Sequence, residues 1–135
     1  MDKKVVIAGF TRSPFHFASK GELATVRPDE MTAQVVRGLL EKTGVDAKEI
    51  EDLILGCAFP EGEQGLNLAR IVGFLADLPL SVGGQTINRF CGSSMQGIHN
   101  AAGGNIQQSS PLGKEESGPP GDPVRSAGPA ARATF

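Results

Sequence analysis

The sequence predicts an α/β protein in which three strands alternate with helices, with a disordered tail after them. Two short apolar runs and a third β-like segment have the length and composition of buried strands. The segments between them carry apolar residues at helical spacing. After residue 108 glycine and proline become frequent and the apolar period is lost. Strands that alternate with helices favour a parallel or mixed sheet covered by helices.

The first strand is expected at residues 4–9. Residues 5–8 read Val-Val-Ile-Ala, a short continuous apolar run of the kind that is buried on both faces of a sheet. A turn is expected next, because Pro14 fixes its own φ and disfavours helix at Ser13.

The clearest amphipathic helix is expected at residues 29–43. Pro28 supplies its start signal and Gly44 its stop signal. A single helical turn follows at residues 46–49, where Asp46 begins an Asp variant of a capping box. The apolar residues of the helix form two adjacent rows with a spacing of four, Met31, Val35 and Leu39 beside Val36 and Leu40.

The second buried strand is expected at residues 52–58. Cys57 lies near its end and is expected to fill the core, because free cysteine is among the most buried residue types. Residues 64–70 lead into a helix that is expected to run through about Leu75. Pro79 closes this region because the residue before a proline leaves the α conformation. Residues 83–87 form the third predicted strand.

Composition excludes several classes of protein. The chain has 135 residues, enough for one domain, and a formal net charge of −2, which argues against nucleic-acid and anionic-membrane partners. No apolar run approaches the ~20 residues that span a bilayer, and the apolar start is too short for a secretory signal. Two cysteines without zinc spacing suit the reducing cytoplasm and give no metal site.

The most distinctive stretch is residues 88–99, which read Asn-Arg-Phe-Cys-Gly-Ser-Ser-Met-Gln-Gly-Ile-His. It predicts the end of a strand, a sharp turn and the start of a helix with Cys91 at its head. Apolar residues then recur at helical spacing, at Met95, Ile98, Ala101, Ala102 and Ile106.

Cys91 is the candidate nucleophile. A thiol at a helix N-terminus lies near unsatisfied N–H groups and the positive end of the macrodipole, which both favour a reactive thiolate. The alternative is that Cys91 is a small buried hydrophobe, as free cysteines usually are. Its position alone leaves both interpretations open.

Residues 88–99 resemble the nucleophile segment of the thiolases, a family of acyl-CoA acetyltransferases and 3-ketoacyl-CoA thiolases. Residues 12–15, Arg-Ser-Pro-Phe, are similar to the turn after the first strand of that family. Residues 65–70 are similar to a family segment of the type Gly-x-Asn-x-Ala-Arg. The resemblance runs from about Lys4 to about Gln108 and covers only the opening part of a usual thiolase. It implies a thiolase-like α/β fold, of which this chain holds an incomplete N-terminal half.

The resemblance also implies a mechanism. Cys91 would accept an acyl group as an acyl-cysteine and pass it on in ping-pong order. The substrates would be coenzyme A and its thioesters, acetyl-CoA among them, in fatty acid metabolism, with no bound cofactor or metal and with a homo-oligomer for the full-length family. The residues that bind coenzyme A stay unknown. His99 lies about 12 Å along the predicted helix from Cys91, so neither it nor His16 is assigned as the base.

Two domains are expected, a partial thiolase N-terminal domain at residues 1–108 and a disordered Gly/Pro-rich tail, unrelated to the family, at 109–135. The tail is interpreted as out-of-frame or otherwise aberrant sequence joined to a thiolase start. The chain would then be a truncated thiolase-type acyltransferase that is inactive alone. One alternative is a non-catalytic fragment that associates with a full-length thiolase. Another is a related condensing enzyme that acts on an acyl carrier protein.

Overall fold

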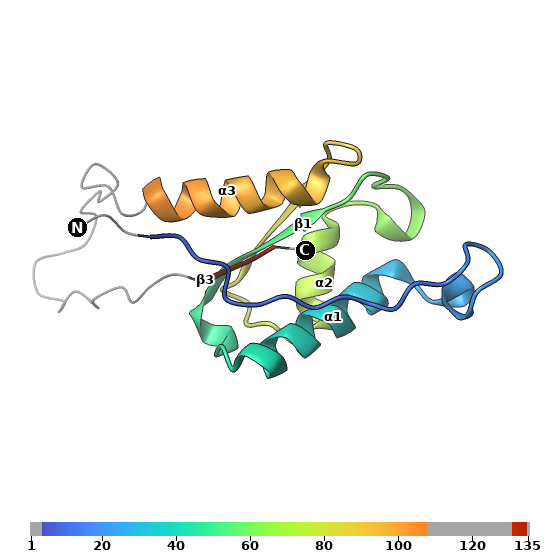
Figure 1. Ribbon diagram of the computed structural model, residues 1–135, viewed down its shortest axis with the longest axis horizontal. Helices are drawn as coiled ribbons and strands as arrows, with labels where there is room; N and C mark the ends of the chain where they lie inside the picture. The colour runs from blue at the N-terminus through green and yellow to red at the C-terminus, as the bar shows by residue number, and fades with distance from the viewer. Residues whose placement is uncertain (1–3, 108–130, 135) are drawn as a thin grey trace, which may run out of the picture.

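The computed structural model describes residues 4–107 and 131–134. In this part of the chain a three-stranded parallel sheet is covered on both faces (Figure 1). α2 contacts one face and α1 packs on α2, while α3 covers the opposite face. The helices and strands are α1 (Pro28–Thr43), β1 (Ile50–Gly56), α2 (Leu68–Leu75), β2 (Gly83–Ile87), α3 (Ser93–Gln107) and β3 (Ala131–Thr134). Short 3₁₀ turns are η1 (Glu22–Thr25), η2 (Ala47–Glu49) and η3 (Gly62–Gln64).

The local signals around α1 are confirmed. Pro28 is its first residue, and Gly44 ends it in the left-handed region at φ 69°. The side chain of Asp46 then accepts a hydrogen bond from the main-chain N–H of Lys48 at 2.9 Å, which is the N-cap part of the predicted capping box. No helix in the described ranges is long and apolar enough to cross a membrane.

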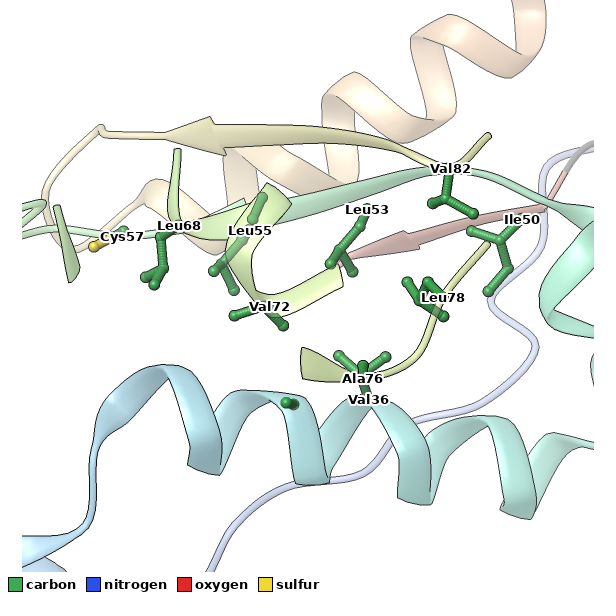
Figure 2. Packing of buried hydrophobic residues seen from close by; sticks show 12 residues of the cluster. Val36, Ile50, Leu53, Leu55, Cys57, Leu68, Val72, Ala76, Leu78 and Val82 are labelled. Atoms are coloured by element: carbon green, nitrogen blue, oxygen red, sulfur yellow. The ribbon is translucent and has the colours of Figure 1, made fainter. Parts of the chain in front are cut away.

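The main hydrophobic core lies between the sheet and α2, and α1 closes it from outside (Figure 2). Leu53 and Leu55 of β1 pack with Val72 of α2 in this layer. Ile54, between the two leucines, points to the other face, where α3 contacts β1. Cys57 is 5% exposed and belongs to the core cluster, as predicted.

The sheet has the order β2-β1-β3. β1 and β2 pair in register from Asp52–Gly83 to Gly56–Ile87, so their C-terminal ends lie side by side. The main-chain N–H of Cys57 extends this pairing by donating to the carbonyl oxygen of Ile87 at 2.9 Å. In parallel sheets, ligands bind at this C-terminal edge.

The prediction of a buried strand at residues 4–9 is wrong for this structure. The segment has no strand structure, and the side chains of Val6 and Ile7 are 77% and 79% exposed. β1 pairs with β2 on one edge and with β3 on the other. Each edge of β1 therefore already has a partner in this structure, and residues 4–9 lie outside the sheet.

The predicted disordered tail, residues 109–135, lies mostly outside the described residues. Its described part, Ala131–Thr134, needs a correction, because it forms β3 parallel to β1. Strand pairing uses main-chain N–H and C=O groups, which every residue except proline supplies in full. Composition therefore gave no signal for β3.

Candidate active site

Cys91 lies in the turn between β2 and α3, at the C-terminal edge of the sheet. The structure places it two residues before the first helical residue, Ser93, rather than at the helix head itself. Its side chain is exposed and its thiol is free. The interpretation of Cys91 as a buried hydrophobe is thereby excluded.

Hydrogen bonds within the turn hold the backbone on both sides of Cys91. The side chain of Asn88 accepts a hydrogen bond from the N–H of Phe90 at 3.0 Å. Phe90 has a φ of 46°, in the left-handed region that residues other than glycine rarely adopt. The N–H of Gly92 donates to the carbonyl oxygen of Arg89 at 3.0 Å, which closes the turn under Cys91.

Ser93 fixes the same turn from the helix side. It is 4% exposed. Its Oγ accepts a hydrogen bond from the N–H of Arg89 at 2.9 Å and donates one to the carbonyl oxygen of Phe90 at 2.6 Å. The sequence predicts Ser93 only as part of a turn. A serine at the first position of a helix was the available signal, but it does not reveal which main-chain groups the hydroxyl meets.

The start of α3 rests on the end of β1. A Cβ added to Gly56 would lie 2.4 Å from the main-chain nitrogen of Ser94, so a side chain at this position would push the helix away. This close approach of Gly56 to Ser94 fixes the distance between the end of β1 and the turn that carries Cys91. Gly56 and Ser93 together therefore determine where Cys91 is presented.

A second polar cluster supports β2 just before the turn. Thr86 Oγ1 donates to Asn67 Oδ1 at 2.8 Å and accepts from the N–H of Ala69 at 2.9 Å. The side-chain amide of Asn67 donates to the carbonyl oxygen of Gly84 at 2.9 Å. Asn67 is also the N-cap of α2. The Gly-x-Asn-x-Ala-Arg segment, residues 65–70, thus attaches the start of α2 to β2.

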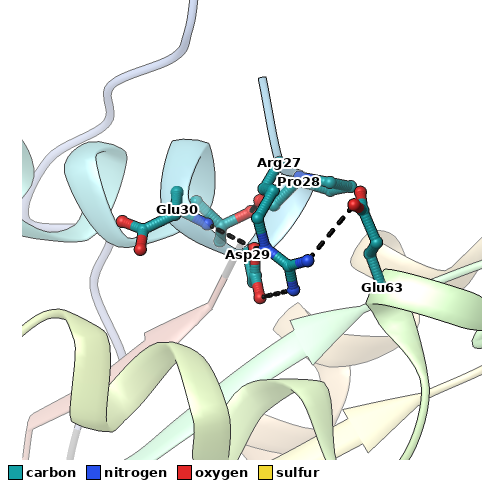
Figure 3. A network of polar contacts seen from close by, with 6 residues as sticks. Arg27, Pro28, Asp29, Glu30 and Glu63 are labelled. Atoms are coloured by element: carbon teal, nitrogen blue, oxygen red, sulfur yellow. Dashed lines mark hydrogen bonds and ion pairs between the residues drawn. The ribbon is translucent and has the colours of Figure 1, made fainter. Parts of the chain in front are cut away.

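An ion-pair network holds the loop before this segment (Figure 3). The Arg27 guanidinium lies 2.7 Å from Asp29 Oδ2 and 3.2 Å from Glu63 Oε1, so it joins the start of α1 to η3. The hydrogen bond from Arg27 lowers the pKa of the Asp29 carboxyl, against the opposing effect of desolvation by burial. The hydrogen bond and the charge of Asp29 raise the pKa of Arg27 in return.

Neither histidine is brought to Cys91 by a hydrogen bond. His16 lies 3.7 Å from the carboxylate of Glu22, and His99 is on α3 eight residues after Cys91. Among the described residues, the Cys91 thiol has no hydrogen-bond or ion-pair partner. The described part of the chain also holds no cluster of three or more His, Cys, Asp or Glu side chains that could bind a metal ion.

Comparison with known proteins points to one family. The family model of the thiolase N-terminal domain matches residues 5–110. A 3-ketoacyl-CoA thiolase of Psychrobacter sp. (strain PRwf-1) is 46% identical over 100 residues, which are 74% of this chain and 26% of that protein. A 3-ketoacyl-CoA thiolase of Bacillus subtilis (strain 168) is 50% identical over 100 residues, with the same two shares. The chain spans about a quarter of the length of the curated relatives it matches.

Proposed function

The chain belongs to the thiolase family, and from this premise we propose that it carries the acyl-accepting cysteine of a thiolase-type acyltransferase, Cys91. One observation above all supports the proposal. Cys91 is an exposed, free thiol in a turn that is held on both sides by hydrogen bonds, within the matched residues. Such a turn presents the sulfur to a substrate while its backbone stays fixed.

The proposed reaction transfers an acyl group between coenzyme A thioesters. The Cys91 thiolate attacks the carbonyl carbon of the acyl donor and forms a C–S bond. With acetyl-CoA, the thioester bond breaks and coenzyme A leaves as a thiolate. With a 3-ketoacyl-CoA, the carbon–carbon bond next to the keto group breaks, and the acetyl-CoA enolate that leaves takes up a proton. In both cases the acyl-cysteine then passes its acyl group to an acceptor.

This chain supplies the thiol and the backbone that positions it. Two main-chain N–H groups in the first turn of α3 already have acceptors, since Ser93 donates to the carbonyl oxygen of Phe90 and Gln96 to that of Gly92. The N–H groups of Ser94 and Met95, between them, are the ones we propose for an oxyanion that forms beside Cys91. A base is still needed to take the proton of the thiol, and none in the described ranges is hydrogen-bonded to it. We therefore expect acyl transfer to Cys91 without sustained turnover. The two free cysteines suit a reaction in the cytoplasm.

The test is covalent labelling followed by intact mass measurement. The chain incubated with acetyl-CoA should gain the mass of one acetyl group, and hydroxylamine should remove it, as expected for a thioester. Cys91→Ser should abolish the adduct, whereas Cys57→Ala should keep it. The absence of an adduct from the unmodified chain, or an adduct that survives in Cys91→Ser, would contradict the assignment. Steady thiolysis of acetoacetyl-CoA would contradict the expectation that turnover is absent.

A second candidate function is association with a full-length thiolase. It is favoured by the outer face of α3, where Met95 is 60% and Ile98 is 41% exposed. Apolar side chains grouped on one helix face favour burial against another protein surface. Co-purification with a separately expressed thiolase, lost in a Met95→Gln/Ile98→Gln variant that keeps its helix content, would support this function. Equal co-purification of both forms would count against it.

A further inference from the structure

We infer that residues 5–8 and β3 are alternative partners for one edge of β1, so that the N-terminal segment displaces β3 from that edge in a second conformation of the chain. The inference concerns the sheet and does not depend on the proposed acyl transfer. Four features of the described residues carry it: the exposure of the segment, the weak pairing of β3, the handedness of the chain connections and the direction in which the segment runs.

Residues 5–8 are exposed although their side chains are suited to the inside of a sheet. Val5, Val6 and Ile7 are 44%, 77% and 79% exposed. Val and Ile are among the residues most often buried, and their branching at Cβ favours the strand conformation. A continuous run of them matches a strand that is covered on both faces, and the sheet here has helices on both faces.

β3 is a weak partner for the edge it occupies. Its sequence, Ala-Arg-Ala-Thr, contains two alanines, which are depleted in strands. Its register with β1 is irregular between Ile50 and Asp52. The stronger strand-forming sequence therefore lies outside the sheet while the weaker one lies within it.

The handedness of parallel connections places residues 4–9 on this same edge. The connection from β1 through α2 leads to β2 on one side of β1. α1 packs on α2, so both helices lie on the same face of the sheet. A strand–helix–strand connection is right-handed in ≈ 98% of cases. A connection from residues 4–9 through α1 to β1 must then move across the sheet in the same direction, which starts it on the edge opposite β2, where β3 is.

The segment already runs in the required direction. A Cβ on Gly9 would lie 2.6 Å from Cγ2 of Thr43, and the side chain of Lys42 donates to the carbonyl oxygen of Phe10 at 3.0 Å. Gly9 and Phe10 therefore lie at the C-terminal end of α1. Thr11 and Ser13 line a hollow together with Met31 and Thr32 near the start of α1, so the segment runs antiparallel to α1. The end of β1 lines the same hollow, so the segment has the direction of β1.

The segment also reaches the C-terminal end of β1. Thr11 and Ser13 line a hollow of about 290 Å³ that is also lined by Leu55 and Gly56 of β1. A shift of the segment along α1 toward this end would bring residues 5–8 beside β1 without reversing the chain. The two conformations thus differ in the position of residues 5–8 along α1 and in whether these residues or β3 form main-chain hydrogen bonds with β1.

Amide hydrogen exchange tests this inference in the full chain. Prolines at two adjacent positions of β3, Arg132→Pro and Ala133→Pro together, remove at least one N–H that faces β1, because these groups alternate between the two edges along a strand. We expect the amides of residues 5–8 that face β1, which are every second one along the segment, to exchange at least about 10-fold more slowly in this variant. The amide of Ile54 should stay protected. It faces the edge that β3 occupies, because the N–H of Cys57 faces β2 and these groups alternate along β1. The matched control Arg132→Ala keeps the N–H and should leave all these rates unchanged.

A second variant separates strand exchange from an unrelated rearrangement. Adding Val6→Pro and Ile7→Pro to the β3 variant should return the remaining amides of residues 5–8 to fast exchange and also speed exchange at the amide of Ile54. Fast exchange of every amide of residues 5–8 in the β3 variant would overturn the inference. Loss of protection in β1, or unfolding of that variant, would overturn it equally, since either outcome means that the N-terminal segment does not fill the vacated edge.

Discussion

The side-chain oxygen of Ser93 accepts a hydrogen bond from the main-chain N–H of Arg89 at 2.9 Å, across the turn that presents Cys91. The same hydroxyl donates to the carbonyl oxygen of Phe90. One buried side chain thus meets two main-chain groups on the far side of the turn. The exposed thiol is held in place by a neighbour that is itself almost inaccessible to solvent.

Ser93→Ala should therefore destabilise the protein. The substitution removes both hydrogen bonds and leaves the partly buried N–H of Arg89 without its acceptor, which typically costs about 1–3 kcal/mol. Urea unfolding, followed by circular dichroism, measures the change. Ser94→Ala is the matched control, since Ser94 is the next residue and is exposed. Equal stabilities of the two variants would show that the Ser93 hydroxyl contributes nothing to the turn.

Gly84→Ala should destabilise the packing of β2 against α2, next to the turn that carries Cys91. A Cβ on Gly84 would lie 2.8 Å from both the Cα and the main-chain nitrogen of Arg70, and backbone atoms cannot move aside as a flexible side chain can. We expect a loss of about 1–3 kcal/mol in the free energy of unfolding. Gly38→Ala is the control, because nothing lies within 4 Å of its added Cβ and it is inside α1, where alanine gains about 0.5–1 kcal/mol over glycine. The prediction fails if both variants shift the unfolding midpoint in the same direction.

The Arg27–Asp29 pair should make stability depend on pH in the acid range. The pKa of Asp29 is lower in the folded chain than its unfolded value of about 3.9, mainly because of the hydrogen bond from Arg27. The stabilisation is therefore fully present above about pH 4 and is lost as the pH falls through the folded pKa. Asp29→Asn should cost about 1 kcal/mol at pH 7, since Arg27 is half exposed and screened by water.

Thermal unfolding of the two forms between pH 7 and pH 2 measures this effect. The difference between the parent and Asp29→Asn should shrink as the pH falls below about 4. Glu30→Gln serves as the control, because Glu30 is the adjacent, exposed acidic residue of the same first turn. A difference that stays constant across the whole range would mean that the Asp29 charge does not stabilise the fold.

The features that the sequence revealed are those that depend on neighbours in the chain. Pro28 and Gly44 mark the start and the end of a helix whatever its apolar face packs against, and α1 lies between them in the structure. The burial of Cys57 followed from an apolar run that ends beside it. The turn around Cys91 was expected from its glycine and serines, and its exposure follows from the sharpness of that turn.

The features that the sequence did not reveal depend on partners far along the chain. Residues 5–8 have the composition of a strand, but whether they pair is decided by what occupies the edge of β1. β3 gave no signal, because main-chain pairing is open to a segment such as Ala-Arg-Ala-Thr. The role of Asn67 depends on the position of β2 beside α2, because its side chain accepts a hydrogen bond from Thr86 of β2.

The two cysteines should differ sharply in reactivity, and this difference tests the site most directly. Cys91 is exposed, while Cys57 is 5% exposed in the core, so a reagent reaches Cys57 only when the surrounding structure opens. In native buffer, iodoacetamide should modify Cys91 at least about 10-fold faster than Cys57, as read from peptide masses over time. In urea above the unfolding midpoint both should react at similar rates. Cys91→Ser should remove the fast phase and leave the slow one unchanged. Rapid modification of Cys57 in native buffer would mean that the core between β1 and α2 is not closed, and the placement of the Cys91 turn above it would then have to be abandoned.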